Sequence, residues 1–359
     1  MVPQGGKPND TRDYILKREE AVLSPWAMRS SMSRGRVNPE PPCAVRTDFQ
    51  RDRDRILHSK AFRRLSHKTQ VFIAPEGDHF RTRLTHTLEV AQIARTISRA
   101  LGLNEDLTEA IALGHDLGHT PFGHMGERIL DRIVRDSGSP DGFRHQLQSV
   151  RVIEVLEKDG RGLNLTFETI DGIRHHSKGL GDYDPGDIGD DPSTFEGKVV
   201  KLADRIAYVS HDLEDAIRAG LVRESDVPGL FVGALGETSR DRINVMVLDV
   251  VAQSRKNNEL CISQEIKEAI NRLKDFLYGW VYEHPKVKAE EERITSVLEG
   301  IFHKLLKDRQ ASVTYLGKWA EDESSRRIMV TDYISGCTDR FAMMIFERMF
   351  VPGFWRLEF

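Results

Sequence analysis

Apolar residues recur along this 359-residue chain at intervals of three and four, which is the period of an α-helix. Between residues 85 and 101 they fall on one helical face, and Gly102 follows as a stop signal. Similar patterns lie at 106–114, 147–158, 166–176, 198–219, 242–254, 263–280, 290–307 and 337–350. The sequence lacks the alternation of strands and helices and the glycine-rich loop of a phosphate-binding α/β protein. The chain is therefore predicted to be an all-α protein.

Charge and apolar content exclude several classes of protein. The 52 basic and 56 acidic residues give a formal net charge of −4, so no global basic field attracts nucleic acid. No run of about 18 apolar residues and no signal-like N-terminus occur, so we expect no membrane partner. The three cysteines, at 43, 261 and 337, are too far apart for a metal-type pair. These features predict a cytoplasmic protein.

The chain divides into three predicted parts. Residues 1–45 are rich in Pro, Gly, Ser and Arg and are expected to form a flexible N-terminal arm. Residues 46–220 hold the chemistry-bearing motifs and form the predicted helical core. Residues 221–359 are expected to be a helical C-terminal region that packs on the core, with an apolar run at 341–350 for core or subunit contacts.

Two charged segments have competing interpretations. The arginines of residues 48–68 alternate with acids, which favours a solvated, ion-paired helix face over a nucleic-acid groove. Residues 179–197 form a predicted polar loop whose acids lack the spacing of a calcium loop. We interpret these acids as solubilising, with a second metal site as the weaker alternative.

Three histidines and two acids crowd into residues 115–127 among small and apolar neighbours. Buried imidazoles and carboxylates are costly unless they are paired or bind a metal. His115 and Asp116 are about 100° apart on a helix, and both can reach one ion at a helix end. A first-row divalent ion accepts both kinds of donor.

Further ligands must come from other segments. His86 lies at the start of the preceding helix, and Asp204 lies beside an apolar helix face. Two histidines and two aspartates leave open positions for water and substrate, as in a catalytic site. A second His-Asp pair occurs at 211–212, so the dipeptide alone does not identify the site. The pair at 175–176 is flanked by basic residues and receives less weight.

Four ordered segments carry a family resemblance. They are SKAFRRLSHKTQVF (59–72), EGDHFRTRLTHTLEVAQIAR (76–95), HDLGHTPFGHMGE (115–127) and KLADRIAYVSHDLEDA (201–216), with a weaker match at 332–352. They resemble HD-domain deoxyguanosinetriphosphate triphosphohydrolases. The resemblance implies an HD-domain helical core with additional C-terminal helices, and one divalent ion: manganese, magnesium or another first-row metal. It also implies cleavage of a deoxynucleoside triphosphate (dNTP) into deoxynucleoside and tripolyphosphate, and a homo-oligomer.

The resemblance also assigns roles to individual residues. As metal ligands it implies His86, His115, Asp116 and Asp204. As catalytic residues it implies His124, with Glu127 as its acidic partner, and His119 facing the phosphates. As substrate contacts it implies Arg83, Tyr208 on the sugar, Asp212 on the 3′-hydroxyl, and His145 as a further active-site histidine. We expect Lys201 or Arg205 to add positive charge for the phosphates.

Other functions remain open at this point. Ser66 and His67 stand where several relatives carry a sugar-reading glutamine, so the preferred dNTP does not follow from the motifs. A nucleotide activator is a further candidate partner. The alternatives are an HD hydrolase acting as a 5′-nucleotidase or on ppGpp-type nucleotides, and a regulator that binds single-stranded nucleic acid and retains an HD site.

Overall fold

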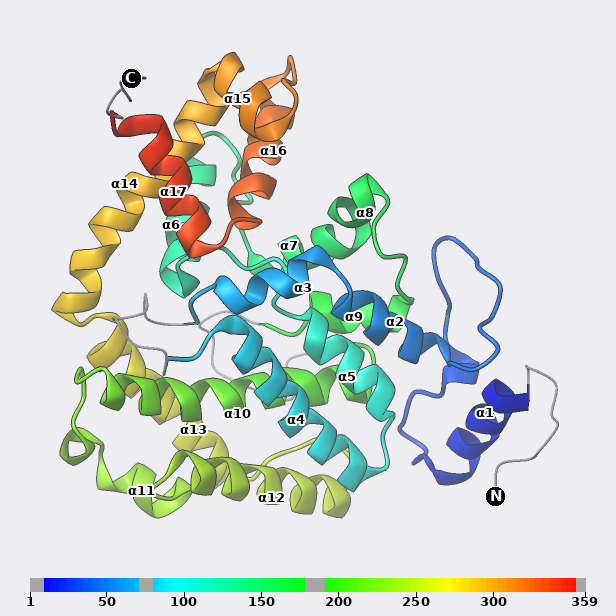
Figure 1. Cartoon of the computed structure of the whole chain (residues 1–359). Coiled ribbons are helices and arrows are strands. Elements are labelled where there is room, and N and C mark those ends of the chain that lie inside the picture. Colours follow the sequence, from blue (N-terminus) through cyan, green and yellow to red (C-terminus); the bar gives the residue numbers. More distant parts are fainter. Residues whose placement is uncertain (1–9, 71–79, 178–190, 353–359) are drawn as a thin grey trace, which may run out of the picture.

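The computed structural model describes residues 10–70, 80–177 and 191–352, and within these ranges the protein consists of helices joined by turns (Figure 1). No strand occurs among the described residues. Only two isolated bridges form there, Arg36 with Thr166 and Thr69 with Thr82. The prediction of an all-α fold is confirmed. No helix in the described part is long and apolar enough to cross a membrane.

The helices vary from short turns to rods of more than twenty residues. Those of the first half are α1 (Asp10–Val22), η1 (Ser30–Met32), α2 (Asp48–Leu57), α3 (Lys60–Arg64), η2 (Leu65–His67), α4 (Arg83–Leu101), α5 (Glu105–Gly114), α6 (Gly123–Asp136), α7 (His145–Arg151), η3 (Val152–Leu156), α8 (Glu157–Gly160) and α9 (Phe167–Arg174). Those of the second half are α10 (Phe195–Arg218), η4 (Glu224–Asp226), α11 (Gly229–Leu235), α12 (Ser239–Asn257), α13 (Gln264–Leu277), η5 (Tyr278–Tyr282), α14 (Pro285–Lys307), α15 (Arg309–Leu316), α16 (Glu323–Ser335) and α17 (Asp339–Phe350).

Local capping signals fix the ends of the helices that carry the predicted metal ligands. The Thr82 side chain accepts a hydrogen bond from the Thr85 amide at the start of α4, and Gly102 ends that helix with a positive φ of 69°. The Asn104 side chain then caps α5 by accepting from the amides of Asp106 and Leu107. Because only a short turn joins them, α4 and α5 pack on each other. Residue 86 therefore comes close to the end of α5.

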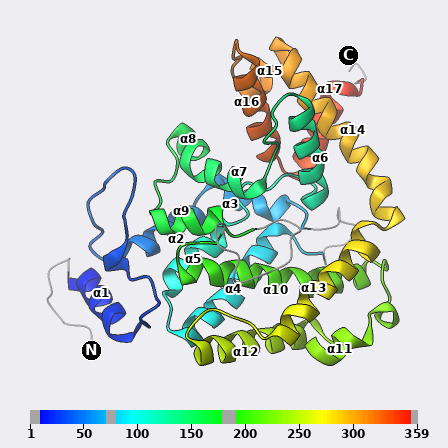
Figure 2. The ribbon, with the colours of Figure 1, turned by 180° about the vertical axis from the view of Figure 1, so that it is seen from behind.

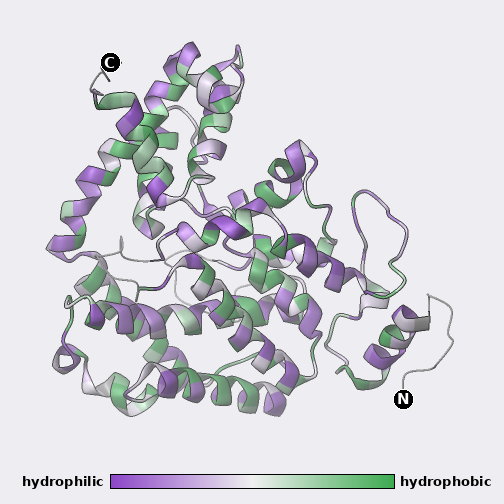
Figure 3. Cartoon of the chain, in the orientation of Figure 1, coloured by the Kyte–Doolittle hydropathy of each residue, from purple (hydrophilic) through white to green (hydrophobic). Residues whose placement is uncertain are grey.

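A large apolar cluster forms the main core. It joins α2, α4, α5 and α10 with α11, α12 and α13, and its centre includes Val90, Ile97, Ile111, Val199 and Ile206. Polar residues cover the outer faces of these helices (Figure 3), as expected for amphipathic elements. Helix α10 passes through the middle of this cluster and carries Asp204 on its course.

A second apolar cluster lies at the other end of the molecule, where α6 packs with α14, α16 and α17 (Figure 2). Its members include Ile129 and Leu130 of α6, Leu298 and Phe302 of α14, and Ile345 of α17. The predicted boundary at residue 220 does not coincide with this division. Helices α11 to α13 extend the main core, whereas α6 belongs to the cluster of the C-terminal helices.

The N-terminal segment differs from the expected flexible arm, at least over its described residues. Helix α1 is followed by a chain that is held by buried carboxylates. Glu19 accepts hydrogen bonds from the amide and hydroxyl of Ser30, and Glu196 of α10 accepts from the amide of Met28 at 3.0 Å. The proline and serine content thus predicted a flexible segment. In the structure, specific hydrogen bonds hold its described part against the core.

The basic segment forms α2, α3 and η2, and its arginines on α2 are ion-paired. Arg51 and Arg55 both contact Glu40, and Arg53 contacts Asp106 at 3.1 Å. This arrangement agrees with the salt-bridged face that the alternating charges favoured. Of the predicted polar loop, residues 179–190 lie outside the described residues.

Candidate metal centre and active site

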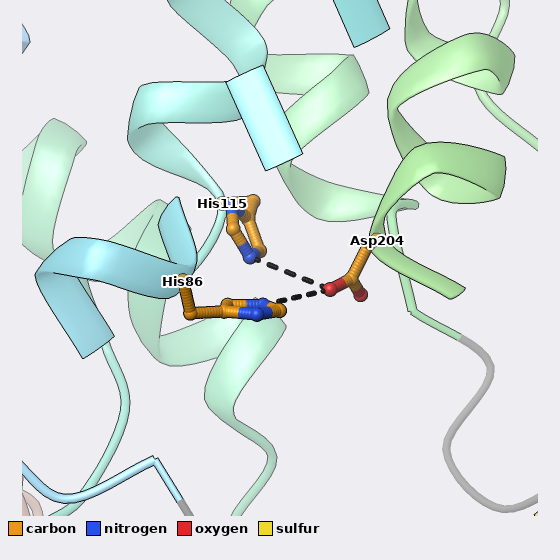
Figure 4. A group of neighbouring side chains, drawn as sticks. All are labelled: His86, His115 and Asp204. Carbon is orange, nitrogen blue, oxygen red and sulfur yellow. Dashed lines mark hydrogen bonds and ion pairs between the residues drawn. The ribbon is translucent and has the colours of Figure 1, made fainter. Parts of the chain in front are cut away.

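Two histidines and two aspartates from three distant segments converge in the main core, and Figure 4 shows three of them, His86, His115 and Asp204. His86 Nε2 lies 3.0 Å from Asp204 Oδ1, and His115 Nε2 lies 3.8 Å from the same oxygen. Asp116 completes the group, with its Oδ1 3.5 Å from His115 Nε2. His86 comes from the first turn of α4, His115 and Asp116 directly follow α5, and Asp204 lies within α10.

The donor atoms of this group suit a divalent cation. The ligand atoms of His86, His115 and Asp204 all lie within 4.8 Å of one another. His115 Nδ1 donates to the Ala112 carbonyl at 2.7 Å, while its buried Nε2 makes no hydrogen bond to any described residue. An imidazole fixed through one nitrogen and unpartnered at the other is the usual arrangement of a metal ligand. Two imidazoles and two carboxylates form a donor set that first-row metals accept.

Both carboxylates of the group are held in the ionised form that a cation requires. Burial acts to raise the pKa of Asp204, but the hydrogen bond to His86 and the nearby His115 lower that pKa strongly. Burial likewise opposes ionisation of Asp116, yet His115 and Arg83 hold the pKa of Asp116 well below its ordinary value.

Arg83 reaches the same centre from the first residue of α4. Its side chain is only 1% exposed, and its guanidinium contacts Asp116 Oδ2 at 2.5 Å and the Gln70 carbonyl at 3.4 Å. The arginine expected to bind a substrate phosphate is thus placed beside the metal centre. Its contacts within the described structure are to the protein.

Four further predicted residues form a second group next to the first. Glu127 Oε1 accepts from His145 Nδ1 at 2.7 Å, and Glu127 Oε2 lies 3.4 Å from His119 Nε2 and 3.8 Å from His124 Nδ1. The sequence predicted Glu127 as the partner of His124, and the structure makes it the partner of three histidines. His145 and His119 hold the pKa of Glu127 well below its ordinary value in spite of burial.

A sharp turn between α5 and α6 places His119, His124 and Glu127, whereas His145 begins α7. Phe122 and Gly123 have φ angles of 64° and 61°, in the left-handed region. A Cβ on Gly126 would lie 1.9 Å from the Pro121 carbonyl oxygen. The glycines that predicted a tight turn are therefore required by close backbone approach. Their effect is to point His124 and Glu127 back toward the centre.

The predicted sugar-contacting residues follow Asp204 along α10. The rings of Tyr208 and His124 have centroids 6.1 Å apart, so the tyrosine lies beside the second group. Asp212 is buried one turn further and accepts a hydrogen bond from the Tyr282 hydroxyl. Burial raises the pKa of Asp212 to about 7. Tyr282, which also stacks on Tyr208, was missed because no motif marks it.

The two cationic candidates of α10 lie on either side of Asp204. Lys201 Nζ pairs with Asp191 Oδ1 at 2.7 Å, so this acid has a contact beyond the solubilising role that we assigned to it. Arg205 is half-buried next to Asp204. The remaining acids of the predicted loop, at 182, 184, 187 and 190, lie outside the described residues.

His176 is a central residue that the sequence interpretation underweighted. It is 2% exposed, its ring centroid lies 5.0 Å from that of His115, and its Nε2 lies 3.1 Å from His145 Nε2. Its neighbour His175 instead contacts Asp171 at 3.1 Å. The spacing of three between the buried Ile173 and His176 is the signal that separates the two, because it places His176, two residues beyond the end of α9, in line with the buried face of that helix.

The all-helical core and its histidine–aspartate centre are those of an HD-domain protein, and the comparisons agree. Residues 83–209 match the HD domain, and residues 260–348 match the phosphohydrolase-associated domain. Both the predicted ligands and the second group fall within the first match. HD domains bind divalent metals, and the buried group described above fits such an ion.

Relatives that extend over nearly the whole chain bear the name deoxyguanosinetriphosphate triphosphohydrolase-like protein. One from Caldanaerobacter subterraneus subsp. tengcongensis is 51% identical, over 96% of this chain and 97% of its own. Others from Desulfatibacillum aliphaticivorans and Clostridium tetani are 48% and 44% identical, over 95% of this chain and 98% and 96% of their own. The chain belongs to the deoxyguanosinetriphosphate triphosphohydrolase-like family of HD-domain hydrolases.

Proposed function

We propose that this protein hydrolyses deoxynucleoside triphosphates to deoxynucleoside and tripolyphosphate at a divalent metal centre. The ligands in this proposal are His86, His115, Asp116 and Asp204. The observation that carries it is the convergence of these four residues beside a second group of three histidines and one glutamate. The names of the relatives support a nucleoside triphosphate as the substrate class.

The proposed chemistry needs a polarised phosphate and a proton for the leaving group. A bound divalent ion supplies Lewis-acid chemistry, which polarises a phosphoryl oxygen and makes a nearby water more acidic. Water attacks the α-phosphorus in line as the bond to the 5′-oxygen breaks. His124 gives a proton to that oxygen or relays it, and Glu127 orients the ring. The side chain of His124 is 36% exposed, against 0% for His119 and 10% for His145, so His124 is the histidine of this group most accessible to substrate.

The other predicted residues serve substrate binding in this proposal. The protein has a net negative charge, so positive charge for the substrate phosphates must be local. Arg83, Lys201 and Arg205 supply it. Tyr208 packs on the sugar, and Asp212 accepts the 3′-hydroxyl with Tyr282 holding its other side. His119 faces the phosphates.

Product analysis with the purified chain tests the proposal. We expect each dNTP, alone or mixed with a second nucleotide as activator, to yield nucleoside and tripolyphosphate in the presence of Mn²⁺ or Mg²⁺. Mixtures reveal whether an activator is needed. Release of orthophosphate from a nucleoside monophosphate, or of pyrophosphate from a ppGpp-type nucleotide, with no dNTP turnover would replace this function with one of the other HD activities.

Two variants separate the metal from the proton-transfer role. His115→Ala should lose bound metal as measured by elemental analysis. His124→Ala should keep the metal and lose turnover by roughly 10²- to 10⁴-fold, the usual contribution of a general acid or base. Full activity of the His124 variant would end its assignment.

The nucleic-acid alternative receives little support. The arginines of α2 that motivated it are paired with Glu40 and Asp106. Oligonucleotide binding that weakens with salt and survives loss of His124 would revive it. The homo-oligomeric state and the cytoplasmic location stay predictions from the sequence.

A further inference from the structure

Three imidazoles at the centre have one ring nitrogen fixed by an acceptor. The Nδ1 atoms of His115 and His176 donate to the carbonyls of Ala112 and Ile173, both at 2.7 Å. His145 Nδ1 donates to the Glu127 carboxylate at 2.7 Å. Since a carbonyl or carboxylate oxygen can only accept, each Nδ1 carries the proton. In the neutral form, which is the form that binds a metal, each of these rings presents its Nε2 lone pair away from the acceptor.

These lone pairs face one another. His145 Nε2 lies 3.1 Å from His176 Nε2 and 4.0 Å from Asp116 Oδ1. Two lone pairs at this separation repel unless a proton or a metal ion lies between them. Donor atoms bound to one ion at about 2.1 Å are about 3.0 Å apart when adjacent and about 4.2 Å apart when opposite. The separations around His145 fall in this range.

We propose that a second divalent cation binds beside the first, held by Nε2 of His145, Nε2 of His176 and the carboxylate of Asp116. Asp116 Oδ1 lies between the two sets, 3.5 Å from His115 Nε2 and 4.0 Å from His145 Nε2, so Asp116 is the shared ligand. His119 is a further donor. It is fully buried, stacks on His145 with centroids 4.7 Å apart, and makes no hydrogen bond within the described part of the chain.

The charge of the centre also suits two ions. The two groups hold three carboxylates, those of Asp116, Asp204 and Glu127, and one guanidinium, that of Arg83, which pairs with Asp116; with neutral imidazoles this leaves two negative charges. One divalent ion neutralises them. A second gives the centre the positive charge that a phosphate-bearing substrate needs. Paired ions about 3.5–4 Å apart are a known clamp for displacement at phosphorus.

Metal counting tests the second site without any substrate. The full chain is stripped with a chelator and reloaded with Mn²⁺, and the bound metal is counted by elemental analysis and by calorimetric titration. We expect two Mn²⁺ per chain, with an exchange-coupled pair in the low-temperature electron paramagnetic resonance spectrum. His176→Ala should bind one Mn²⁺ and show the spectrum of an isolated ion.

His175→Ala is the matched control, because that neighbouring histidine contacts Asp171 and not the centre. It should still bind two ions. His145→Gln is a second test of the site, and circular dichroism shows whether each variant is folded. Saturation of the wild type at one uncoupled ion per chain would overturn the proposal. A proton shared by His145 and His176 would then explain their 3.1 Å contact.

The count is independent of the proposed function. A chain that hydrolyses dNTPs with one ion keeps that function and loses the second site. A chain that binds two coupled ions but does not turn over dNTPs keeps the second site and loses the proposed function.

Discussion

Glu196 is a buried carboxylate that links the N-terminal segment to the core. Its Oε1 accepts hydrogen bonds from the amides of Met28 and Asn104 at 3.0 and 2.9 Å, and its Oε2 has no hydrogen-bond partner among the described residues. Burial raises the pKa of Glu196 to about 7, and the nearby carboxylate of Glu19 acts in the same direction. The protonation of this one side chain is therefore coupled to folding.

We expect Glu196→Gln to flatten the dependence of stability on pH. Between pH 4.5 and 7 the folded wild type holds a proton at Glu196 that the unfolded chain releases. The free energy of unfolding should thus fall with rising pH across this window, by about 3 kcal/mol, and then level off. Glutamine removes that contribution. Urea unfolding at pH 5, 6, 7 and 8 measures it, with the exposed Glu259→Gln as control. Parallel curves for wild type and Glu196→Gln would contradict the assignment.

At the same scale, local motifs reveal some site residues and miss others. His115, Asp116 and Asp204 were predicted because each stands in a distinctive local pattern. Tyr282 was not predicted, because it contacts Asp212, which is 70 residues away in the chain, and no local sequence pattern indicates that contact. His176 falls between these cases. Its spacing of three from Ile173 indicated a buried position, but the basic residues Arg174 and Lys178 nearby lowered the weight that we gave it.

The turn from α5 to α6 is the element on which both groups of the site depend. Its backbone folds so tightly that a Cβ on Gly126 would meet the Pro121 carbonyl oxygen at 1.9 Å. Backbone atoms cannot move aside as a flexible side chain can. A methyl group there must displace the turn that carries His119 and the first turn of α6.

We therefore expect Gly126→Ala to reduce kcat by at least about 10-fold, since small misplacements of catalytic groups cost that much or more. The metal content should stay near that of the wild type, because the clash is with Pro121, at the opposite end of the turn from His115 and Asp116, and because His86 and Asp204 lie on other helices. The free energy of unfolding should drop by about 1–3 kcal/mol. Gly233→Ala in α11 is the control, since a Cβ there meets no atom within 4 Å. Equal kcat values for the two variants would contradict this role of the turn.

Helix prediction succeeded where one face of the helix is buried in the core. The patterns at 198–219 and 290–307 correspond to α10 and α14, whose inner faces line the two apolar clusters. Helix α16 escaped notice because only Val330 and Ile334 of its apolar side chains are buried, too few to set a period. The same holds for α1, where the buried residue is Glu19.

For the whole molecule, the proposed active site lies where the two apolar clusters meet. The main cluster holds the helices of His86, His115 and Asp204, while α6, with His124 and Glu127, packs against the C-terminal helices. Composition could not locate this division, because both clusters have the same kinds of residue and α6 joins partners more than 150 positions away. The placement of the proposed metal ligands relative to the proposed proton donor, His124, therefore depends on the contacts between the clusters.

Two side chains make those contacts at the turn itself. Asp339, in the first turn of α17, accepts hydrogen bonds from the amides of Thr69 and Phe122, both at 2.9 Å. Lys68 is buried and donates from its Nζ to the carbonyls of His119 and Ser335. One buried amino group thus ties the turn between α5 and α6 to the end of α16, and one carboxylate ties that turn to α17.

Lys68→Met tests whether these ties position the site. Methionine nearly fills the space of the lysine but leaves two buried carbonyls without a donor, at about 1–3 kcal/mol for each unsatisfied group. We expect a lower free energy of unfolding and a kcat reduced by at least about 10-fold, with little change in metal content, because the carbonyl of His119 is freed and not the metal ligands. Lys60→Met is the matched control: its side chain is 62% exposed and pairs only loosely with Asp159 at 3.5 Å, so its stability should stay within about 0.5 kcal/mol. If Lys68→Met loses stability yet keeps the wild-type kcat and KM, Lys68 holds the two clusters together without positioning the turn between α5 and α6.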